Sequence, residues 1–123
     1  MATKILLVDD SPSVRRAMRL CIEQNPELRV CGEAENGQAA VELFVSLQPN
    51  LVIMDFAMPV KNGLDAAGEI SRIAPGVPIL MCTMFKSEQL VTEARKAGVK
   101  KVISKGEKLS SSLLPTIKDV LAS

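Results

Sequence analysis

The sequence contains no histidine, no tyrosine and no tryptophan, and its only aromatic residues are Phe44, Phe56 and Phe85. Without histidine, the chain lacks the nitrogen ligands that commonly complete a zinc site. With so few aromatic rings, it also lacks the platforms on which proteins stack nucleic-acid bases or flavins. These absences argue against a zinc centre and against a nucleotide-stacking pocket.

The sequence also has few cysteines and almost no net charge. Cys21, Cys31 and Cys82 are an odd number, are widely spaced and have apolar neighbours, which predicts reduced, buried packing residues rather than a disulfide framework. The 15 basic and 14 acidic residues give a formal net charge of +1, so the chain has no electrostatic footprint for nucleic acid or an anionic membrane surface. We therefore expect no direct binding to nucleic acid.

The chain also has no long hydrophobic run. No apolar stretch approaches the length of a membrane span, and the first one, Ile5 to Val8, is too short for a signal peptide. These features predict a cytoplasmic protein without membrane association. Since 123 residues with 47% hydrophobic content suffice for one core, we expect residues 1–123 to form a single domain.

Short apolar runs at regular spacing predict five strands. They cover residues 4–8, 28–33, 51–54, 77–83 and 99–104. The run Leu51–Met54 lies between prolines and is continuously apolar, which is typical of a strand buried on both faces at the centre of a parallel sheet. The run at 28–33 is mixed with charge, which favours an outer strand.

A helix is predicted after each strand. These helices begin near Pro12, Gly37, Leu64 and Ser87, and the last one carries Leu113, Ile117, Val120 and Leu121. Pro115 is expected in the first turns of the last helix or at a bend in it. Alternating strands and helices predict an α/β fold, a doubly wound (βα)5 domain with a parallel five-stranded sheet.

Polar residues follow four of the predicted strands at the point where each strand ends. They are Asp9 and Asp10, Asp55, Thr83, and Lys105. Because ligands bind at the carboxyl edge of open parallel sheets, we expect these side chains to converge on a site there. Asp55 alone would equally suit the start of a turn. The convergence of all four groups favours a reactive site over a structural role for Asp55.

This set of side chains suits phosphoryl transfer. Three neighbouring carboxylates remain ionised together only with a cation, and ligation by oxygen alone selects a hard ion such as Mg²⁺. Lys105 supplies a positive charge and Thr83 a hydroxyl donor, which match the oxygens of a phosphoryl group. A carboxylate nucleophile, a metal, a lysine and a hydroxyl are a sufficient set, because the protein mainly positions the reacting groups.

These residues resemble the receiver domain of two-component response regulators. The resemblance covers essentially the whole chain. It depends on Asp9-Asp10, on Asp55 followed by Met58-Pro59 and Asn62-Gly63, on Thr83, and on Lys105. It implies a flavodoxin-like sheet of strand order 2-1-3-4-5.

The resemblance also implies a role for each site residue. Asp55 would accept a phosphoryl group from a sensor histidine kinase. Asp10 and Asp55 would bind Mg²⁺ directly, Asp9 would assist through metal-bound water, and the Ala57 backbone carbonyl would be another ligand. Thr83 would move to hydrogen-bond the phosphoryl group, and Lys105 would pair with it.

The family's activity and partners follow from the same resemblance. Such a chain is not a conventional enzyme, but it catalyses its own phosphorylation and slow autodephosphorylation. Its output would pass to a downstream protein or to a C-terminal output domain. A phosphorylation-dependent homodimer is a further state that the resemblance allows.

Five positions depart from the usual receiver pattern. Val102 replaces an aromatic residue before the lysine, Met84 replaces a small residue after the threonine, and Gly106 replaces a proline. These changes predict an altered signalling relay, a more restricted site and a less rigid last loop. Ala57 and Phe85 stand where polar side chains commonly hold the hydrolytic water, which predicts a long-lived phosphorylated form.

Other readings fit less well. A phosphatase of the haloacid dehalogenase type needs a second acid where Ala57 stands. A flavodoxin needs a phosphate-cradling loop and aromatic walls, and a nucleotide-hydrolysing P-loop needs a glycine-rich run, all of which are missing. The serious alternative is a receiver-like protein-binding module that is not phosphorylated.

Overall fold

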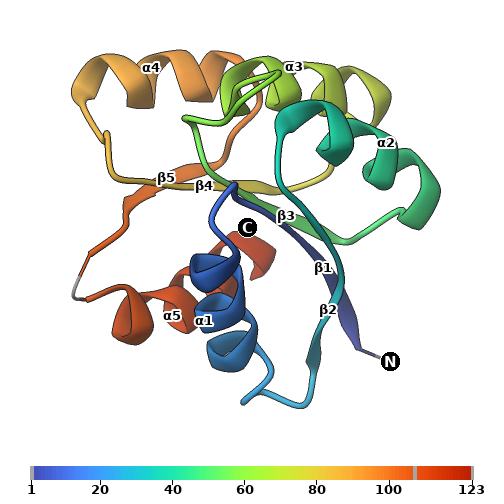
Figure 1. The fold of residues 1–123 in the computed structure, drawn as a ribbon, viewed down its shortest axis with the longest axis vertical. Helices are drawn as coiled ribbons and strands as arrows, with labels where there is room; N and C mark the ends of the chain where they lie inside the picture. The colour runs from blue at the N-terminus through green and yellow to red at the C-terminus, as the bar shows by residue number, and fades with distance from the viewer. Residues whose placement is uncertain (1, 107, 123) are drawn as a thin grey trace.

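The computed structural model describes residues 2–106 and 108–122. Strands and helices alternate along the chain in the order β1 (Thr3–Val8), α1 (Pro12–Ile22), β2 (Leu28–Ala34), α2 (Gly37–Leu47), β3 (Leu51–Met54), α3 (Gly63–Ile73), β4 (Ile79–Thr83), α4 (Glu88–Lys96), β5 (Lys101–Ser104) and α5 (Leu109–Ala122). The sheet has the order β2-β1-β3-β4-β5, and all its neighbouring strands are parallel (Figure 1). The predicted fold class and strand order are confirmed.

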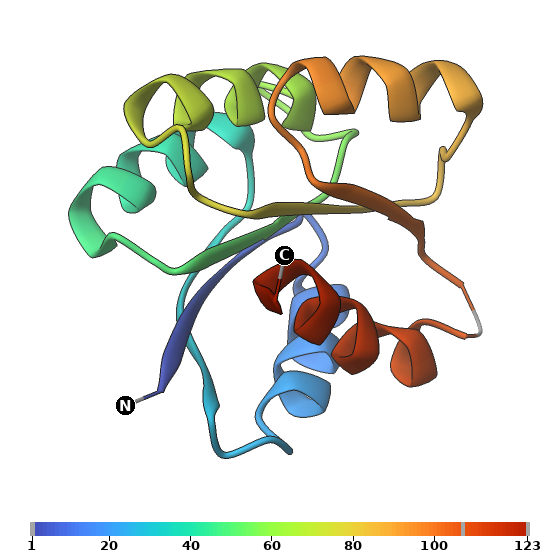
Figure 2. The same cartoon turned by 180° about the vertical axis from the view of Figure 1, so that it is seen from behind.

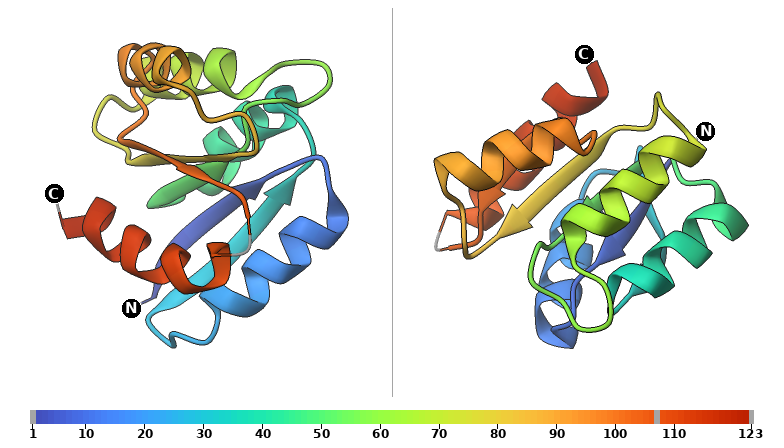
Figure 3. Two further views of the ribbon diagram at one scale, coloured as in Figure 1. Left: turned by 90° about the vertical axis from the view of Figure 1, so that its left-hand side faces the viewer. Right: turned by 90° about the horizontal axis from the view of Figure 1, so that it is seen from above.

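Helices cover both faces of the sheet. Figures 1 and 2 show α2, α3 and α4 on one face and α1 and α5 on the other, and Figure 3 shows α2, α3 and α4 lying side by side. Successive side chains of a strand point to opposite faces. In β1, Leu6 therefore packs under α2 and α3, whereas Leu7 packs against α1 and α5. Two helix layers explain why Leu51–Met54 is apolar at every position and fully buried.

Side-chain caps set the starts of the helices at the carboxyl edge of the sheet. Ser11, Asn36, Asn62 and Ser87 each accept a hydrogen bond from a backbone N–H in the first turn of the helix that follows. None of the helices within the described ranges is both long and apolar enough to cross a membrane.

The last two strands begin later than predicted. β4 begins at Ile79 instead of residue 77, because Pro78 has no N–H to give to the ladder. β5 begins at Lys101 instead of residue 99, because the N–H of Val99 donates to Ala94 O at the end of α4 (2.9 Å). Both strands still end where predicted, so the polar residues after them keep their places.

Pro115 lies inside α5, in the second turn of the helix. Proline cannot donate the backbone hydrogen bond that would bind the carbonyl of Ser111. The next residue, Thr116, adds a side-chain bond from its Oγ1 to a different carbonyl, Ser112 O (2.7 Å). The helix nevertheless continues past the proline to Ala122.

The three cysteines are all free. Only Cys82 is buried, and burial raises the pKa of its thiol to about 12. Cys21 and Cys31 are half-buried, so the prediction of burial is right for Cys82 and wrong for the other two, although Cys21 packs against the core. Cys21 lies on α1, with its Sγ 3.6 Å from Ser110 O of α5, and Cys31 lies on the edge strand β2.

Candidate functional site

The carboxyl edge of the sheet brings three carboxylates together. Asp9 and Asp10 follow β1, and Asp55 follows the neighbouring strand β3. Carboxylate oxygens of all three lie within 4.8 Å of one another. Asp9 and Asp55 are buried, whereas Asp10 is exposed. The cluster therefore has two carboxylates fixed in the protein and one facing solvent.

Lys105 supplies the cation of this cluster. Its Nζ lies 2.8 Å from Asp55 Oδ2 and also forms an ion pair with Asp9. Burial by itself lowers the pKa of Lys105, but the hydrogen bonds and negative charges of Asp55 and Asp9 outweigh burial and raise it. Lys105 is therefore a permanent positive charge beside the two buried carboxylates.

Asp55 is held from two directions. Its N–H donates to Val8 O of β1 (3.0 Å), and its Oδ1 accepts the N–H of Phe56 (2.7 Å). Gly63 lies against the Asp55 carbonyl oxygen, where a Cβ would clash, and its N–H donates to Phe56 O (2.8 Å). This close approach explains why glycine stands at position 63 in the motif after Asp55.

The loop between β3 and α3 contains a strained turn. Val60 has a φ of 70°, and Lys61 N–H donates to Pro59 O across it (2.7 Å). A β-branched residue is disfavoured in this left-handed region. The Lys61 carbonyl accepts the N–H of Gly37 at the start of α2 (3.0 Å), which ties the loop to its neighbour. Nothing in the sequence around Val60 indicates this conformation.

Thr83 and Ala57 complete the set of predicted site residues. Thr83 ends β4, beside β3, and is fully buried. Its Oγ1 accepts the N–H of Phe85 (3.2 Å), and no hydrogen bond links it to Asp55 in the described part of the chain. Ala57 lies exposed in the loop after β3.

The sequence did not indicate a role for Arg15. This residue near the start of α1 donates from Nη1 to the backbone carbonyl of Asp9 (2.6 Å) and from Nε to Glu33 of β2 (2.8 Å). Arg19 donates to the other oxygen of Glu33 at 2.7 and 2.9 Å. Helical spacing identifies no partner for Arg15, and only the packing of α1 against β2 reveals the contact.

The departures from the receiver pattern occupy different environments. Val102 is buried beneath α4 as part of the core. Met84 and Phe85 are 66% and 62% exposed, so most of each side chain faces solvent, and the expected restriction of the site is not supported. A Cβ at Gly106 would meet no atom within 4 Å, so packing does not require glycine there.

The donor set fits a hard divalent cation. Three carboxylates face one ammonium group, which leaves an excess of negative charge. Asp9 Oδ2 is buried and, apart from its ion pair with Lys105, has no hydrogen-bond partner among the described residues. All the ligand atoms on offer are oxygens, the type that Mg²⁺ prefers.

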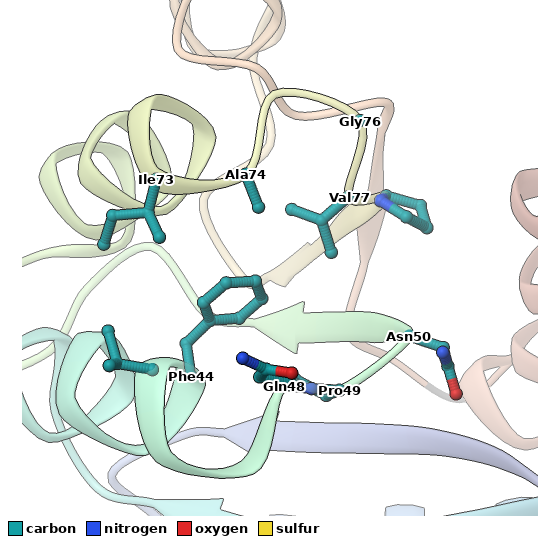
Figure 4. A pocket seen from close by; sticks show the side chains of 10 residues that line it. Phe44, Gln48, Pro49, Asn50, Ile73, Ala74, Gly76 and Val77 are labelled. Atoms are coloured by element: carbon teal, nitrogen blue, oxygen red, sulfur yellow. The ribbon is translucent and has the colours of Figure 1, made fainter.

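A separate cavity lies at the opposite edge of the sheet. It has a volume of about 490 Å³ and lies between α2 and α3, before β3 and β4 begin (Figure 4). Its lining is mixed, with the apolar side chains of Phe44 and Val77 and the polar ones of Gln48 and Asn50. It contains none of the acidic residues and is not part of the site.

Known proteins are similar to this chain in sequence and in fold. The family model for the response regulator receiver domain matches residues 5–114. The chemotaxis protein CheY of Halobacterium salinarum is 40% identical over 98% of this chain and 98% of its own length. The transcriptional regulatory protein YdfI of Bacillus subtilis is 38% identical over 79% of this chain but only 45% of its own length.

Solved structures of response regulator domains have the same fold as this chain. The response regulator domain of Thermotoga maritima CheB matches with a TM-score of 0.93 and 28% identity, over 100% of this chain and 98% of that one. The family match, the full-length relative and the strand order lead to one conclusion. The chain belongs to the response regulator receiver domain family of two-component systems.

Proposed function

We propose that the chain is a phosphorylation-dependent switch in which Asp55 accepts a phosphoryl group from a sensor histidine kinase. The observation that carries this proposal is the pairing of the Lys105 ammonium with Asp55 and Asp9, beside a third carboxylate. Lysine in that place offsets the charge of the nucleophile and of the incoming phosphoryl oxygens.

Residues of the acidic cluster would hold the metal. Asp10 and Asp55 would bind Mg²⁺ directly, Asp9 would hold a metal-bound water, and the Ala57 carbonyl would be a further ligand. Bound Mg²⁺ would offset the negative charge that gathers when a phosphoryl group approaches the carboxylates.

The chemical step requires a carboxylate oxygen of Asp55 as nucleophile. That oxygen would form a bond to phosphorus while the nitrogen–phosphorus bond of the phosphohistidine breaks. The imidazole nitrogen keeps the electron pair of the broken bond, and the product on this chain is an acyl phosphate. The hydrogen bond from Phe56 N–H to Asp55 Oδ1 helps to fix the carboxylate for attack.

Thr83 would report the phosphorylated state. Its hydroxyl would turn to donate to a phosphoryl oxygen, and Lys105 would move from Asp55 to pair with the same group. Since Thr83 Oγ1 now accepts the N–H of Phe85, this turn would alter the start of the segment that leads to α4. Val102 is buried on the neighbouring strand β5, so the change would travel through packing and not through an aromatic ring.

The partners follow from this scheme. Residues 1–123 would act as one receiver domain, with a histidine kinase before it and a downstream protein or a C-terminal output domain after it. The relatives support both arrangements, because one has this chain's length and another is about twice as long.

The alternative is a receiver-like binding module without phosphorylation. The complete set of carboxylates, lysine and threonine at one edge of the sheet favours the switch. Incubation with acetyl phosphate and Mg²⁺, followed by intact-mass measurement, separates the two functions. The switch requires a gain of one phosphoryl group, whereas the binding module requires an unchanged mass.

A further inference from the structure

Arg15 connects three elements near the acidic cluster. It belongs to α1, it donates from Nη1 to the Asp9 carbonyl at the end of β1, and it donates from Nε to Glu33 on β2. Its side chain is only 16% exposed. The positive end of the helix dipole disfavours a cation near the start of α1. The hydrogen bonds of Arg15 to Asp9 and Glu33 therefore hold it in a position that the helix dipole disfavours.

With the hydrogen bond from Arg15, every polar atom of Asp9 is held by a partner. The Asp9 N–H donates to Ala34 O (3.0 Å), and Asp9 Oδ1 accepts the N–H of Ser11 (2.9 Å). Asp9 Oδ2 pairs with Lys105, and the carbonyl accepts from Arg15 (2.6 Å). Each polar atom of Asp9 thus has one partner, and Arg15 is the partner that holds the peptide group leading to Asp10.

Asp10 depends on that peptide group for its orientation. Its side chain is exposed and accepts no hydrogen bond from the residues that the structure describes. Nothing else therefore fixes the direction in which its carboxylate points. If the Asp9–Asp10 peptide rotates, the Asp10 oxygen moves relative to Asp9 and Asp55.

We propose that Arg15 is a positioning residue for the metal site, which fixes the Asp9–Asp10 peptide so that the Asp10 carboxylate is pre-arranged for Mg²⁺. Glu33 holds the guanidinium in place through its Oε1, whereas Arg19 pairs with the other oxygen, Oε2. This inference rests on the proposed function, since it assumes that the acidic cluster binds Mg²⁺. Groups that orient metal ligands from outside commonly change metal affinity by about 10-fold or more when altered.

Two substitutions separate positioning from charge. Arg15→Lys keeps the positive charge but cannot reach both Asp9 and Glu33 with the planar fork of a guanidinium. Arg15→Gln removes the charge, and loss of a nearby cation by itself would tighten Mg²⁺ binding. Positioning predicts weaker binding in both variants, whereas a pure charge effect predicts tighter binding in Arg15→Gln.

Arg19→Lys is the matched control. Arg19 binds the same carboxylate, Glu33, from the same helix, but no hydrogen bond or ion pair links it to Asp9 within the described residues. If Arg15 acted only by joining α1 to β2, the two Lys variants would have the same effect. Melting temperatures measured without metal report the general stability of each variant.

The experiment is a calorimetric Mg²⁺ titration of the full chain and its variants. We expect about 10-fold weaker binding in Arg15→Lys and in Arg15→Gln, with Arg19→Lys within about twofold of the unaltered chain. Unchanged or tighter binding in either Arg15 variant, or an equal loss in Arg19→Lys, would overturn the inference alone. Failure of the unaltered chain to bind Mg²⁺ would overturn the metal site of the proposed function as well.

Discussion

Lys105 Nζ lies 2.8 Å from Asp55 Oδ2, although the two residues are 50 positions apart in the chain. Lys105 follows the edge strand β5, and its side chain also reaches Asp9 after β1, so it spans the site across the ends of β3 and β4. It offsets the repulsion between two buried carboxylates. The ion pair is therefore a determinant of stability as well as a part of the site.

Replacing Lys105 should destabilise the protein most in the absence of metal. Lys105→Gln leaves Asp9 and Asp55 buried without their cation, which we expect to cost about 1–3 kcal/mol of unfolding free energy. Bound Mg²⁺ would replace part of the lost charge, so the cost should be smaller at saturating Mg²⁺. Urea unfolding with and without Mg²⁺ measures both values. An equal loss of unfolding free energy in the two conditions would contradict the idea that Lys105 and Mg²⁺ offset the same carboxylate charges.

The Glu33 ion pairs predict a pH-dependent term in stability. Partial burial by itself raises the pKa of Glu33, but hydrogen bonds and charges from Arg19 and Arg15 outweigh it, so its pKa is lowered from 4.5. A lowered folded-state pKa gives stability that is fully present above 4.5 and is lost as the pH falls through the folded-state value.

The difference in unfolding free energy between the unaltered chain and Glu33→Gln should therefore shrink as the pH falls below 4.5. Denaturant unfolding across that range measures it. Added salt at neutral pH should also shrink the difference, because partly exposed ion pairs are screened. A difference in unfolding free energy that grows on acidification would contradict a lowered pKa of Glu33 in the folded protein.

Val60→Gly should stabilise the protein. Val60 has a φ of 70° and is 81% exposed, so its side chain contributes strain and little packing. We expect a gain of about 1 kcal/mol, which is the relief of strain minus the greater freedom of glycine in the unfolded chain. Val60→Ala is the control, since it keeps a Cβ and should gain less. Loss of stability in Val60→Gly, measured by thermal unfolding, would show that the turn is not strained.

The phosphorylated form should lose its phosphoryl group slowly. Neither Ala57 nor Phe85 can hydrogen-bond an attacking water, and both are exposed, so replacing them should leave the core intact. In the double variant Ala57→Asn with Phe85→Glu, we expect hydrolysis to be faster by about 10²-fold at fixed Mg²⁺. Decay of the phosphorylated mass after removal of the donor gives the rate. An unchanged rate would show that these positions do not control hydrolysis.

The sheet and the convergence of the acidic residues could be predicted from sequence because both depend on local patterns. A continuous apolar run such as Leu51–Met54 has to be covered on two faces, which requires helices on both sides of a parallel sheet. A polar residue directly after such a run then has to lie at the carboxyl edge. For that reason Asp55 and Lys105 could be expected to meet.

Other features depend on contacts or backbone angles that the sequence pattern does not encode. Arg15 meets Glu33 and Asp9 only because α1 packs beside β2, and helical periodicity identifies neither partner. Val60 is unfavourable in its own turn, so residue preference points away from the observed conformation. The exposure of Phe85 likewise depends on how the loop before α4 leaves the sheet.

The most direct test of the account is phosphorylation of Asp55 itself. The full chain is incubated with acetyl phosphate and Mg²⁺, and its intact mass is measured alongside that of Asp55→Asn and of Asp119→Asn, an exposed acid on α5 that serves as control. The account predicts a gain of one phosphoryl group in the unaltered chain and in Asp119→Asn, and none in Asp55→Asn. A phosphoryl group on Asp55→Asn, or none on the unaltered chain, would contradict it.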